Sequence, residues 1–102
     1  MKKLSLIIHK DLEESLSDYL HSLPQVKGFT FIHVEGHGTE ATSDLALSAR
    51  DLVMGFRPQI RTDLLLEDHQ VGQVLESLRG AKLGLSGHTF FWVTPVEQSG
   101  RL

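Results

Sequence analysis

The sequence predicts an α+β fold in which two helices cover one face of an antiparallel, four-stranded sheet. The first observation is the order of apolar periods along the chain, which is strand, helix, strand, strand, helix, strand. The second is the length of 102 residues, which fits a single domain over residues 1–102. This order of elements is the split βαβ arrangement of ferredoxin-like folds, and we therefore expect that architecture.

The spacing of apolar residues changes from that of a strand to that of a helix near residue 10, which marks the end of the first strand and the start of the first helix. Residues 3–8 alternate two sets of side chains that are both largely apolar, as in a strand. Apolar residues then recur at helical spacing, namely Leu12, Leu16, Tyr19, Leu20 and Leu23. We expect Asp11 and Glu14 to form the capping pair of this helix and Pro24 to end it.

Four further elements complete the order. Residues 28–36 form a second strand, with Phe29, Phe31, His33 and Glu35 on one face and Thr30, Ile32 and Val34 on the other. Residues 60–67 form a third strand, and Asp68 is placed to cap a second helix. The buried stripe of that helix is predicted to be Val71, Val74, Leu75 and Leu78. Residues 88–95 form the fourth strand.

The distribution of aromatic residues predicts an oligomer. Two helices cover one face of the sheet, yet the strands carry aromatic residues on both faces: Phe29, Phe31, Phe90, Phe91 and Trp92. Soluble monomers rarely expose a large apolar patch, so a second copy is expected to cover the other face. The alternative is that the long loop and the C-terminal tail cover it.

Composition excludes several classes of function. The formal charge of −3 gives no electrostatic reason to expect nucleic acid, and the absence of cysteine excludes disulfides and thiolate chemistry. No apolar run has the length of a membrane span, and the N-terminal stretch is too short and too acidic for a signal peptide. We expect a cytoplasmic protein without direct membrane insertion.

A long segment between the second and third strands, residues 37–55, is the main candidate for function. Loops longer than about 12–15 residues in compact domains are usually functional or disordered. This one is unusually apolar in its second half, so we expect it to become ordered on a partner protein. The predicted contact residues are Arg50, Asp51, Leu52, Val53 and Met54. The alternative is a disordered connection without a task.

The six histidines suggest a metal site as a second hypothesis. His33 and His37 are four residues apart, and Glu35 and Glu40 lie near them in the sequence. Metal binding requires imidazole nitrogens that converge with such carboxylates; otherwise each histidine is a surface or interface residue. No nucleophile elbow, Walker pattern or paired His-Glu helix motif is present, so we do not expect an enzyme.

Two stretches resemble the PII signal-transduction family. The stretch VKGFTFIHVEGHG is similar to the glycine-flanked second strand of PII proteins, and ARDLVMGFRPQIRTDLLLEDHQVGQVLESL is similar to the segment that follows their T-loop. The likeness covers nearly the whole chain. It implies a ferredoxin-like trimer that binds a small ligand in clefts between subunits and projects its T-loop, here residues 37–55, toward a partner such as a membrane transporter.

The resemblance also implies a set of ligand-binding residues. They are Thr30, Gly36, His37, Gly38, Gly84, Gly87, His88 and Arg101. Thr39 and Glu40 replace the arginine-glutamine pair of the family, and Gln59 stands where a lysine is expected. A polyphosphate requires positive charge, so a bound adenine nucleotide would carry fewer phosphates than ATP.

Three functions therefore remain open. The first is a PII-like regulator that senses a small ligand. The second is a histidine-based metal-binding or metal-tolerance protein, similar to the CutA proteins or associated with metal efflux, with His33 and His37 as ligands to a divalent metal. The third is a ferredoxin-like domain that only mediates assembly.

Overall fold

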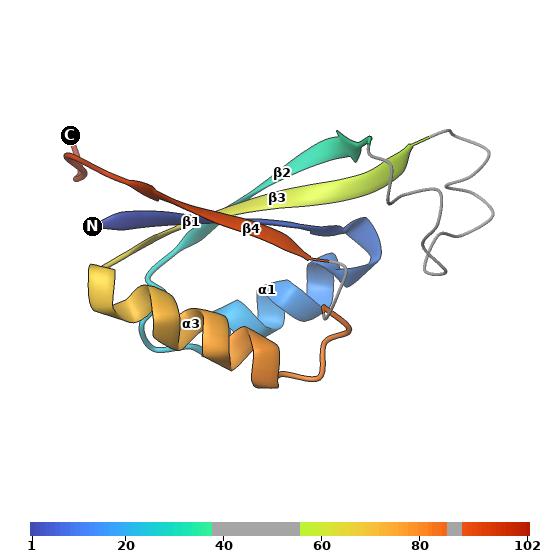
Figure 1. Cartoon of the computed structure of the whole chain (residues 1–102), viewed down its shortest axis with the longest axis horizontal. Helices are drawn as coiled ribbons and strands as arrows, with labels where there is room; N and C mark the ends of the chain where they lie inside the picture. Colours follow the sequence, from blue (N-terminus) through green and yellow to red (C-terminus); the bar gives the residue numbers. More distant parts are fainter. Residues whose placement is uncertain (38–55, 86–88) are drawn as a thin grey trace.

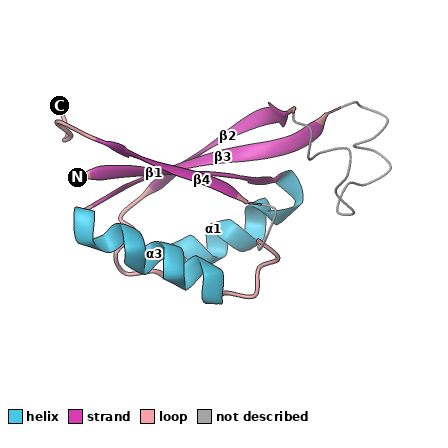
Figure 2. Ribbon diagram, viewed as in Figure 1, coloured by secondary structure: helices cyan, strands magenta, loops and turns pink. Residues whose placement is uncertain are grey.

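The computed structural model describes residues 1–37, 56–85 and 89–102. Its elements are β1 (Lys2–His9), a 3₁₀ turn (Lys10–Leu12), α1 (Glu13–Ser22), β2 (Phe29–Gly36), β3 (Arg57–Leu66), α3 (Asp68–Gly80) and β4 (Phe90–Pro95). The strands form one antiparallel sheet in the order β2-β3-β1-β4. Both helices lie on the same face of this sheet (Figures 1 and 2). The predicted ferredoxin-like α+β fold is confirmed.

The core lies between the sheet and the two helices. In the register of the sheet, Leu4 pairs with Leu64 and Leu6 pairs with Thr62, so alternate residues of β1 and β3 face the helices together. The apolar side chains buried there are Leu4, Leu6, Ile8, Leu16, Leu20, Ile60, Leu64, Leu66, Val74, Leu78 and Leu85. The predicted apolar stripes of both helices are therefore confirmed, with their outer members partly buried against this core.

The other face of the sheet, which we call the open face, is covered by neither α1 nor α3 (Figure 1). It contains exposed apolar side chains toward its margins, with Ile32 46% exposed, Leu65 49% and Phe90 69%. Its centre is polar, because Ser5 on β1 pairs with Asp63 on β3. The prediction that both faces carry aromatic residues is confirmed, but the open face is mixed in character rather than uniformly apolar.

Strand β3 begins at Arg57, three residues before the predicted start. Proline lacks the N–H that a central strand needs, which argued against including Pro58. The pairing explains its presence, because β1 ends opposite Gln59 and only β2 extends beside Pro58.

The predicted cap of the first helix is wrong. An additional 3₁₀ turn follows β1, so α1 begins at Glu13, and Leu12 at its N-cap offers no side-chain hydrogen bond. The backbone N–H of Asp11 instead donates to Nδ1 of His9 at 3.1 Å. Asp11 and Glu14 therefore do not form a capping pair.

The predicted cap of the second helix is also wrong, by one residue. Glu67 is the N-cap of α3, and its backbone N–H donates to the side-chain oxygen of Gln70 at 2.9 Å in a capping box. Asp68 lies in the first turn, where it accepts a hydrogen bond of 2.8 Å from the N-terminal ammonium of Met1. This hydrogen bond, assisted by the charge of Lys2, holds the pKa of Asp68 below its ordinary value.

Neither α1 nor α3 is long and apolar enough to cross a membrane, and no other helix of the described residues is.

Candidate functional site

Three predicted ligand-binding residues lie toward one end of the sheet. Gly36 is the last residue of β2, His37 follows it, and Gly84 belongs to the connection between α3 and β4. Figure 1 shows this connection near the end of the molecule at which β2 ends. Because β2 and β4 are opposite edge strands, three strand spacings, or about 14 Å, separate them across the sheet.

Gly36 lies close to a side chain and to the backbone of β3. A Cβ atom at this position would overlap the side-chain amide of Gln59 and lie 3.2 Å from the backbone oxygen of Arg57. The side chain of Gln59 therefore occupies the space that any larger residue at position 36 would need. The glycine predicted from the family pattern has a steric role in the hairpin, whether or not it contacts a ligand.

His37 lies against two side chains at the same end of the sheet. Its Nε2 is 3.1 Å from a carboxylate oxygen of Glu35, and its ring centroid is 5.8 Å from that of Phe56. The histidine and the glutamate are both more than half exposed. The ring is thus held near the point where the chain leaves β2 and re-enters β3.

Gly84 adopts a backbone conformation that favours glycine. Its φ angle is +78°, in the left-handed region that residues with a Cβ atom rarely occupy. Lys82, two residues earlier, is exposed. A Cβ atom at Gly84 would meet open space, so the backbone angle alone explains the glycine.

Thr30 and Arg101 lie far from these residues within one chain. Thr30 and Gly36 are six residues apart in one strand, or about 20 Å. Arg101 is exposed in the C-terminal tail, and Figure 1 shows that the tail lies at the end of the molecule away from Gly36. A single subunit therefore does not bring the predicted ligand-binding residues together.

The two histidines predicted as metal ligands face different carboxylates. His33 on β2 has its Nε2 3.3 Å from a carboxylate oxygen of Glu13 on α1, whereas His37 faces Glu35. The contact between His33 and Glu13 was not predicted, because it joins two elements whose packing the sequence does not specify. Within residues 1–37, 56–85 and 89–102, no group of three or more histidines and carboxylates is placed to share a metal ion.

A polar cluster at the centre of the open face was also not predicted. Ser5 Oγ donates to Asp63 Oδ1 at 2.7 Å, and Arg61 Nε donates to the same oxygen at 3.1 Å. The guanidinium of Arg61 lies 5.3 Å from the centroid of the Trp92 ring, in cation–π geometry. The cluster thus joins β1, β3 and β4 across the sheet.

The carboxylate of Asp63 is ionised more readily than an ordinary aspartate. Partial burial acts to raise its pKa, but this effect is outweighed by the hydrogen bonds from Ser5 and Arg61 and by the charges of Arg61 and Lys3. The pKa of Asp63 is therefore lowered. The alternation of polar and apolar residues in the strands could have indicated this cluster, once the strand register was known.

The remaining predicted site residues lie outside the described residues. Among the ligand-binding predictions these are Gly38, Gly87 and His88. All five predicted partner contacts, Arg50, Asp51, Leu52, Val53 and Met54, also lie there.

The fold and these positions define the chain as an α+β protein of ferredoxin-like architecture with a long β2–β3 connection. The chain belongs to the family described as protein of unknown function (DUF3240), whose model matches residues 1–102. A crystal structure of a DUF3240 family protein from Shewanella baltica OS155 superposes with a TM-score of 0.75. It is 22% identical to this chain and matches over 99% of it and 94% of the other chain, and at that identity the likeness shows the fold.

Curated relatives extend the similarity to regulatory proteins. The nitrogen regulatory protein P-II of Azospirillum brasilense is 27% identical over 103 residues, covering 100% of this chain and 91% of the relative. The proteins of the same name from Rhodospirillum rubrum and Pasteurella multocida are 24% and 28% identical, with the same coverage. The resemblance to the PII family is thus confirmed as a distant relationship over the whole chain.

Proposed function

We propose that this protein is a PII-like regulator rather than an enzyme. In this proposal the chain forms one domain that assembles as a homotrimer in the cytoplasm, binds a small ligand in clefts between its subunits, and engages a partner protein through residues 37–55. The observation that carries the proposal is the alignment of the complete chain with proteins named nitrogen regulatory protein P-II.

The separation of the candidate site residues supports a ligand site that two subunits share. Gly36 and His37 lie about 20 Å along the sheet from Thr30, which is too far for one small pocket within a subunit. Two copies that bring the Thr30 end of one beside the Gly36 end of the other would complete such a site. Assembly is then a condition of ligand binding, and the affinity for ligand depends on the oligomeric state.

The open face supports assembly by a second route. Phe90, Ile32 and Leu65 are exposed around a polar cluster that is already internally hydrogen-bonded. Apolar surface gains free energy when a second copy removes it from water, whereas the paired Asp63 and Arg61 can be covered without leaving an unpaired charge. We therefore place the contacts between subunits on this face.

The segment between β2 and β3 would transmit the bound state to a partner. His37 and Gly36 at its start are proposed ligand contacts, so a ligand there would favour one conformation of the segment over another. A membrane transporter or its accessory protein is the kind of partner that the PII resemblance implies. The proposed partner contacts remain Arg50, Asp51, Leu52, Val53 and Met54.

A ligand panel tests this function. The melting temperature of the protein would be measured by differential scanning fluorimetry with ATP, ADP, AMP, cyclic AMP and bicarbonate, and with copper, zinc and nickel. A ligand that binds only the native state raises the melting temperature. We expect an adenine nucleotide to do so in the wild-type protein and less in Arg101→Gln.

The control for this panel is Lys27→Gln, which removes an exposed cation between α1 and β2. It should respond to the nucleotide as the wild type does. A response to metals alone would favour the histidine-based alternative, and equal responses of Arg101→Gln and Lys27→Gln would remove Arg101 from the site. Indifference to every ligand would contradict the sensing function.

A further inference from the structure

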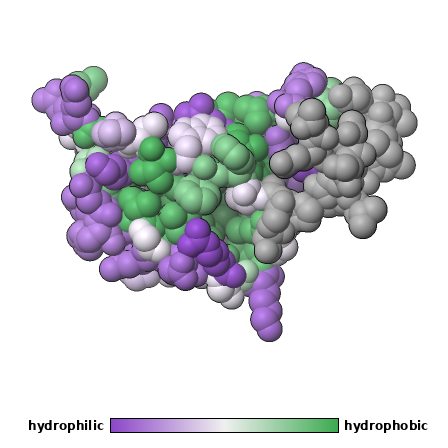
Figure 3. All heavy atoms as spheres, in the orientation of Figure 1, coloured by the Kyte–Doolittle hydropathy of each residue, from purple (hydrophilic) through white to green (hydrophobic). Residues whose placement is uncertain are grey.

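A cavity within one subunit lies between α3, β1, β4 and the connection that joins α3 to β4. Its volume is about 420 Å³, within the range of about 300–1,000 Å³ that small-molecule sites occupy. The apolar part of its wall is formed by Leu6, Leu75, Leu78, Leu85 and Phe91. Figure 3 shows the apolar surface that surrounds it, spread over β4 and the adjoining side of α3.

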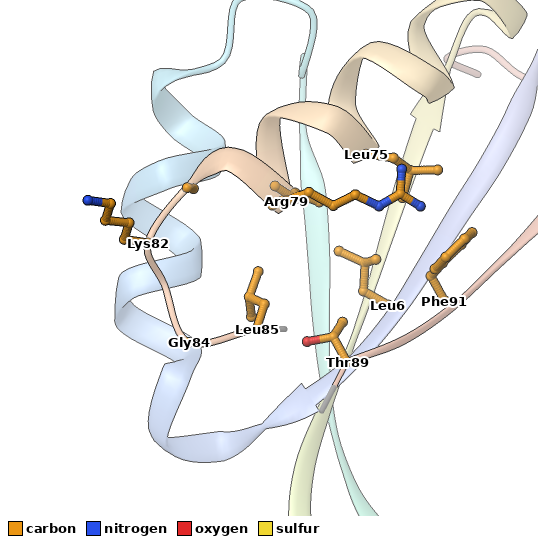
Figure 4. A pocket seen from close by; sticks show the side chains of 10 residues that line it. Leu6, Leu75, Arg79, Lys82, Gly84, Leu85, Thr89 and Phe91 are labelled. Atoms are coloured by element: carbon orange, nitrogen blue, oxygen red, sulfur yellow. The ribbon is translucent and has the colours of Figure 1, made fainter. Parts of the chain in front are cut away.

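A polar atom of this wall is buried. The side-chain oxygen of Thr89 is inaccessible to solvent and, among the residues that the structure describes, has no hydrogen-bond partner. Figure 4 shows the hydroxyl directed toward Leu85, on the cavity side of β4. Buried polar atoms are nearly always hydrogen-bonded, so an unpaired hydroxyl facing a cavity indicates that something else completes its bonding.

Two cations, Arg79 and Lys82, also line the cavity, and each is paired or directed elsewhere. Arg79 Nη1 donates to a carboxylate oxygen of Glu76 at 2.6 Å, and both side chains are largely exposed. Figure 4 shows the ammonium of Lys82 directed away from the cavity. A carboxylate bound at Thr89 would therefore lose its hydration without a facing cation, which is unfavourable. An uncharged polar group is the better partner for the threonine.

From these observations we infer that this cavity is a binding site for a small uncharged organic molecule with an apolar body and one hydroxyl or carbonyl group. The body lies against the leucines and Phe91, and the polar group pairs with Thr89 Oγ1. The described residues that line the cavity all come from one subunit. Gly84, which is also a proposed contact of the cleft between subunits, lines this cavity (Figure 4), so the two sites adjoin.

A titration with three related probes tests the inference. The ¹⁵N-labelled full-length protein would be titrated with 2-phenylethanol, with phenylacetate and with ethanol, and its amide resonances followed by NMR. We expect 2-phenylethanol to bind and to shift the amides of Ala81, Thr89 and Phe91. Phenylacetate keeps the ring but adds a charge, and ethanol lacks the ring, so both should bind at least about fivefold more weakly.

Two variants distinguish the contribution of the Thr89 hydroxyl to binding from that of the cavity. Thr89→Val removes the hydroxyl at nearly constant volume and should weaken binding of 2-phenylethanol about fivefold, the effect of one hydrogen bond. Thr94→Val is the matched control, because Thr94 lies on the same strand but on the open face. Ala81→Phe places a ring in the lining at the C-cap of α3 and should abolish binding.

The outcomes are distinct. Equal weakening by Thr89→Val and Thr94→Val, or tighter binding of phenylacetate than of 2-phenylethanol, would overturn the proposed chemistry of the ligand. Shifts confined to the open face, or no shifts at all, would overturn the site itself. The titration is made without nucleotide, so none of these results requires that the protein binds one.

Discussion

Two adjacent residues of β3 show that the surroundings of a polar side chain decide whether it stabilises or destabilises the fold. Asp63 faces the open side of the sheet, where Ser5 and Arg61 donate hydrogen bonds to it. Thr62 faces the helices, where its hydroxyl is buried and has no hydrogen-bond partner within residues 1–37, 56–85 and 89–102. The hydrogen bonds of its neighbours stabilise the Asp63 carboxylate, whereas burial of the Thr62 hydroxyl costs desolvation free energy that no hydrogen bond offsets.

Asp63→Asn tests the polar cluster through its dependence on pH. Because the pKa of Asp63 is lower in the folded state, its stabilising contribution is present above the unfolded pKa of about 4 and is lost as the pH falls through the folded value. We expect the substitution to reduce the free energy of unfolding at pH 7 by about 1–2 kcal/mol, with a smaller difference below pH 4. Urea unfolding at several pH values measures it.

The control is Asp18→Asn, which changes an exposed carboxylate on α1. It should change the free energy of unfolding by no more than about 0.5 kcal/mol. An Asp63→Asn deficit that stays constant down to pH 3 would show that the charge of Asp63 does not stabilise the fold.

Thr62→Val should stabilise the protein. Valine fills nearly the same volume and removes a buried hydroxyl that no described residue pairs with, so the free energy of unfolding should rise by about 1 kcal/mol. Thermal unfolding at one protein concentration measures the change. Thr94→Val, at a half-exposed position, should have little effect, and a loss of stability in Thr62→Val would mean that the hydroxyl is hydrogen-bonded in solution.

At the scale of elements, the sequence predicts the order of strands and helices well because each buries one periodic set of side chains. The alternation in β2 and the apolar stripe of α3 are examples. The register of the sheet confirms the first, and the residues of the core confirm the second. Helix starts were less predictable. Glu67 is the cap of α3 through its capping box with Gln70, whereas the carboxylate of Asp68 accepts a hydrogen bond from the N-terminal ammonium, 67 positions away in the sequence.

The candidate site was less predictable than the fold for a related reason. The pattern of glycines and histidines identifies positions, but not which of them meet in space. His33 and His37 are near in sequence, yet they face Glu13 and Glu35. The cluster of Ser5, Arg61 and Asp63 appears only when β1 and β3 are aligned side by side.

The β2–β3 hairpin permits a test of why position 36 is glycine. A Cβ atom there would overlap the side chain of Gln59, so Gly36→Ala should lower the free energy of unfolding by about 1 kcal/mol. In a Gln59→Ala background that penalty should fall by at least half, because the obstructing amide is gone. A double-mutant cycle from urea unfolding measures this coupling.

Gly72→Ala provides the contrasting case. Gly72 lies inside α3 and a Cβ atom there meets open space, so alanine should stabilise the helix by about 0.5–1 kcal/mol. If Gly36→Ala were equally stabilising, or if Gln59→Ala did not alter its effect, the steric explanation of Gly36 would be wrong.

At the scale of the whole molecule, the open face and the separated site residues both point to assembly. Phe90 is the most exposed aromatic residue of the sheet and lies 6.3 Å, between ring centroids, from Trp92. Burying it against a second copy would contribute about 1.5–3 kcal/mol per subunit. The same assembly is what would place Thr30 of one subunit near Gly36 of another.

The molar mass of the protein in solution, measured by light scattering coupled to size-exclusion chromatography, tests the proposed assembly. We expect three times the chain mass of 11.4 kDa for the wild type. We expect a lower mass for Phe90→Lys, whose exposed position leaves the fold of the subunit unchanged, and the wild-type mass for Leu102→Lys. A wild-type mass of 11.4 kDa would contradict the proposed assembly and, with it, a ligand site shared between subunits.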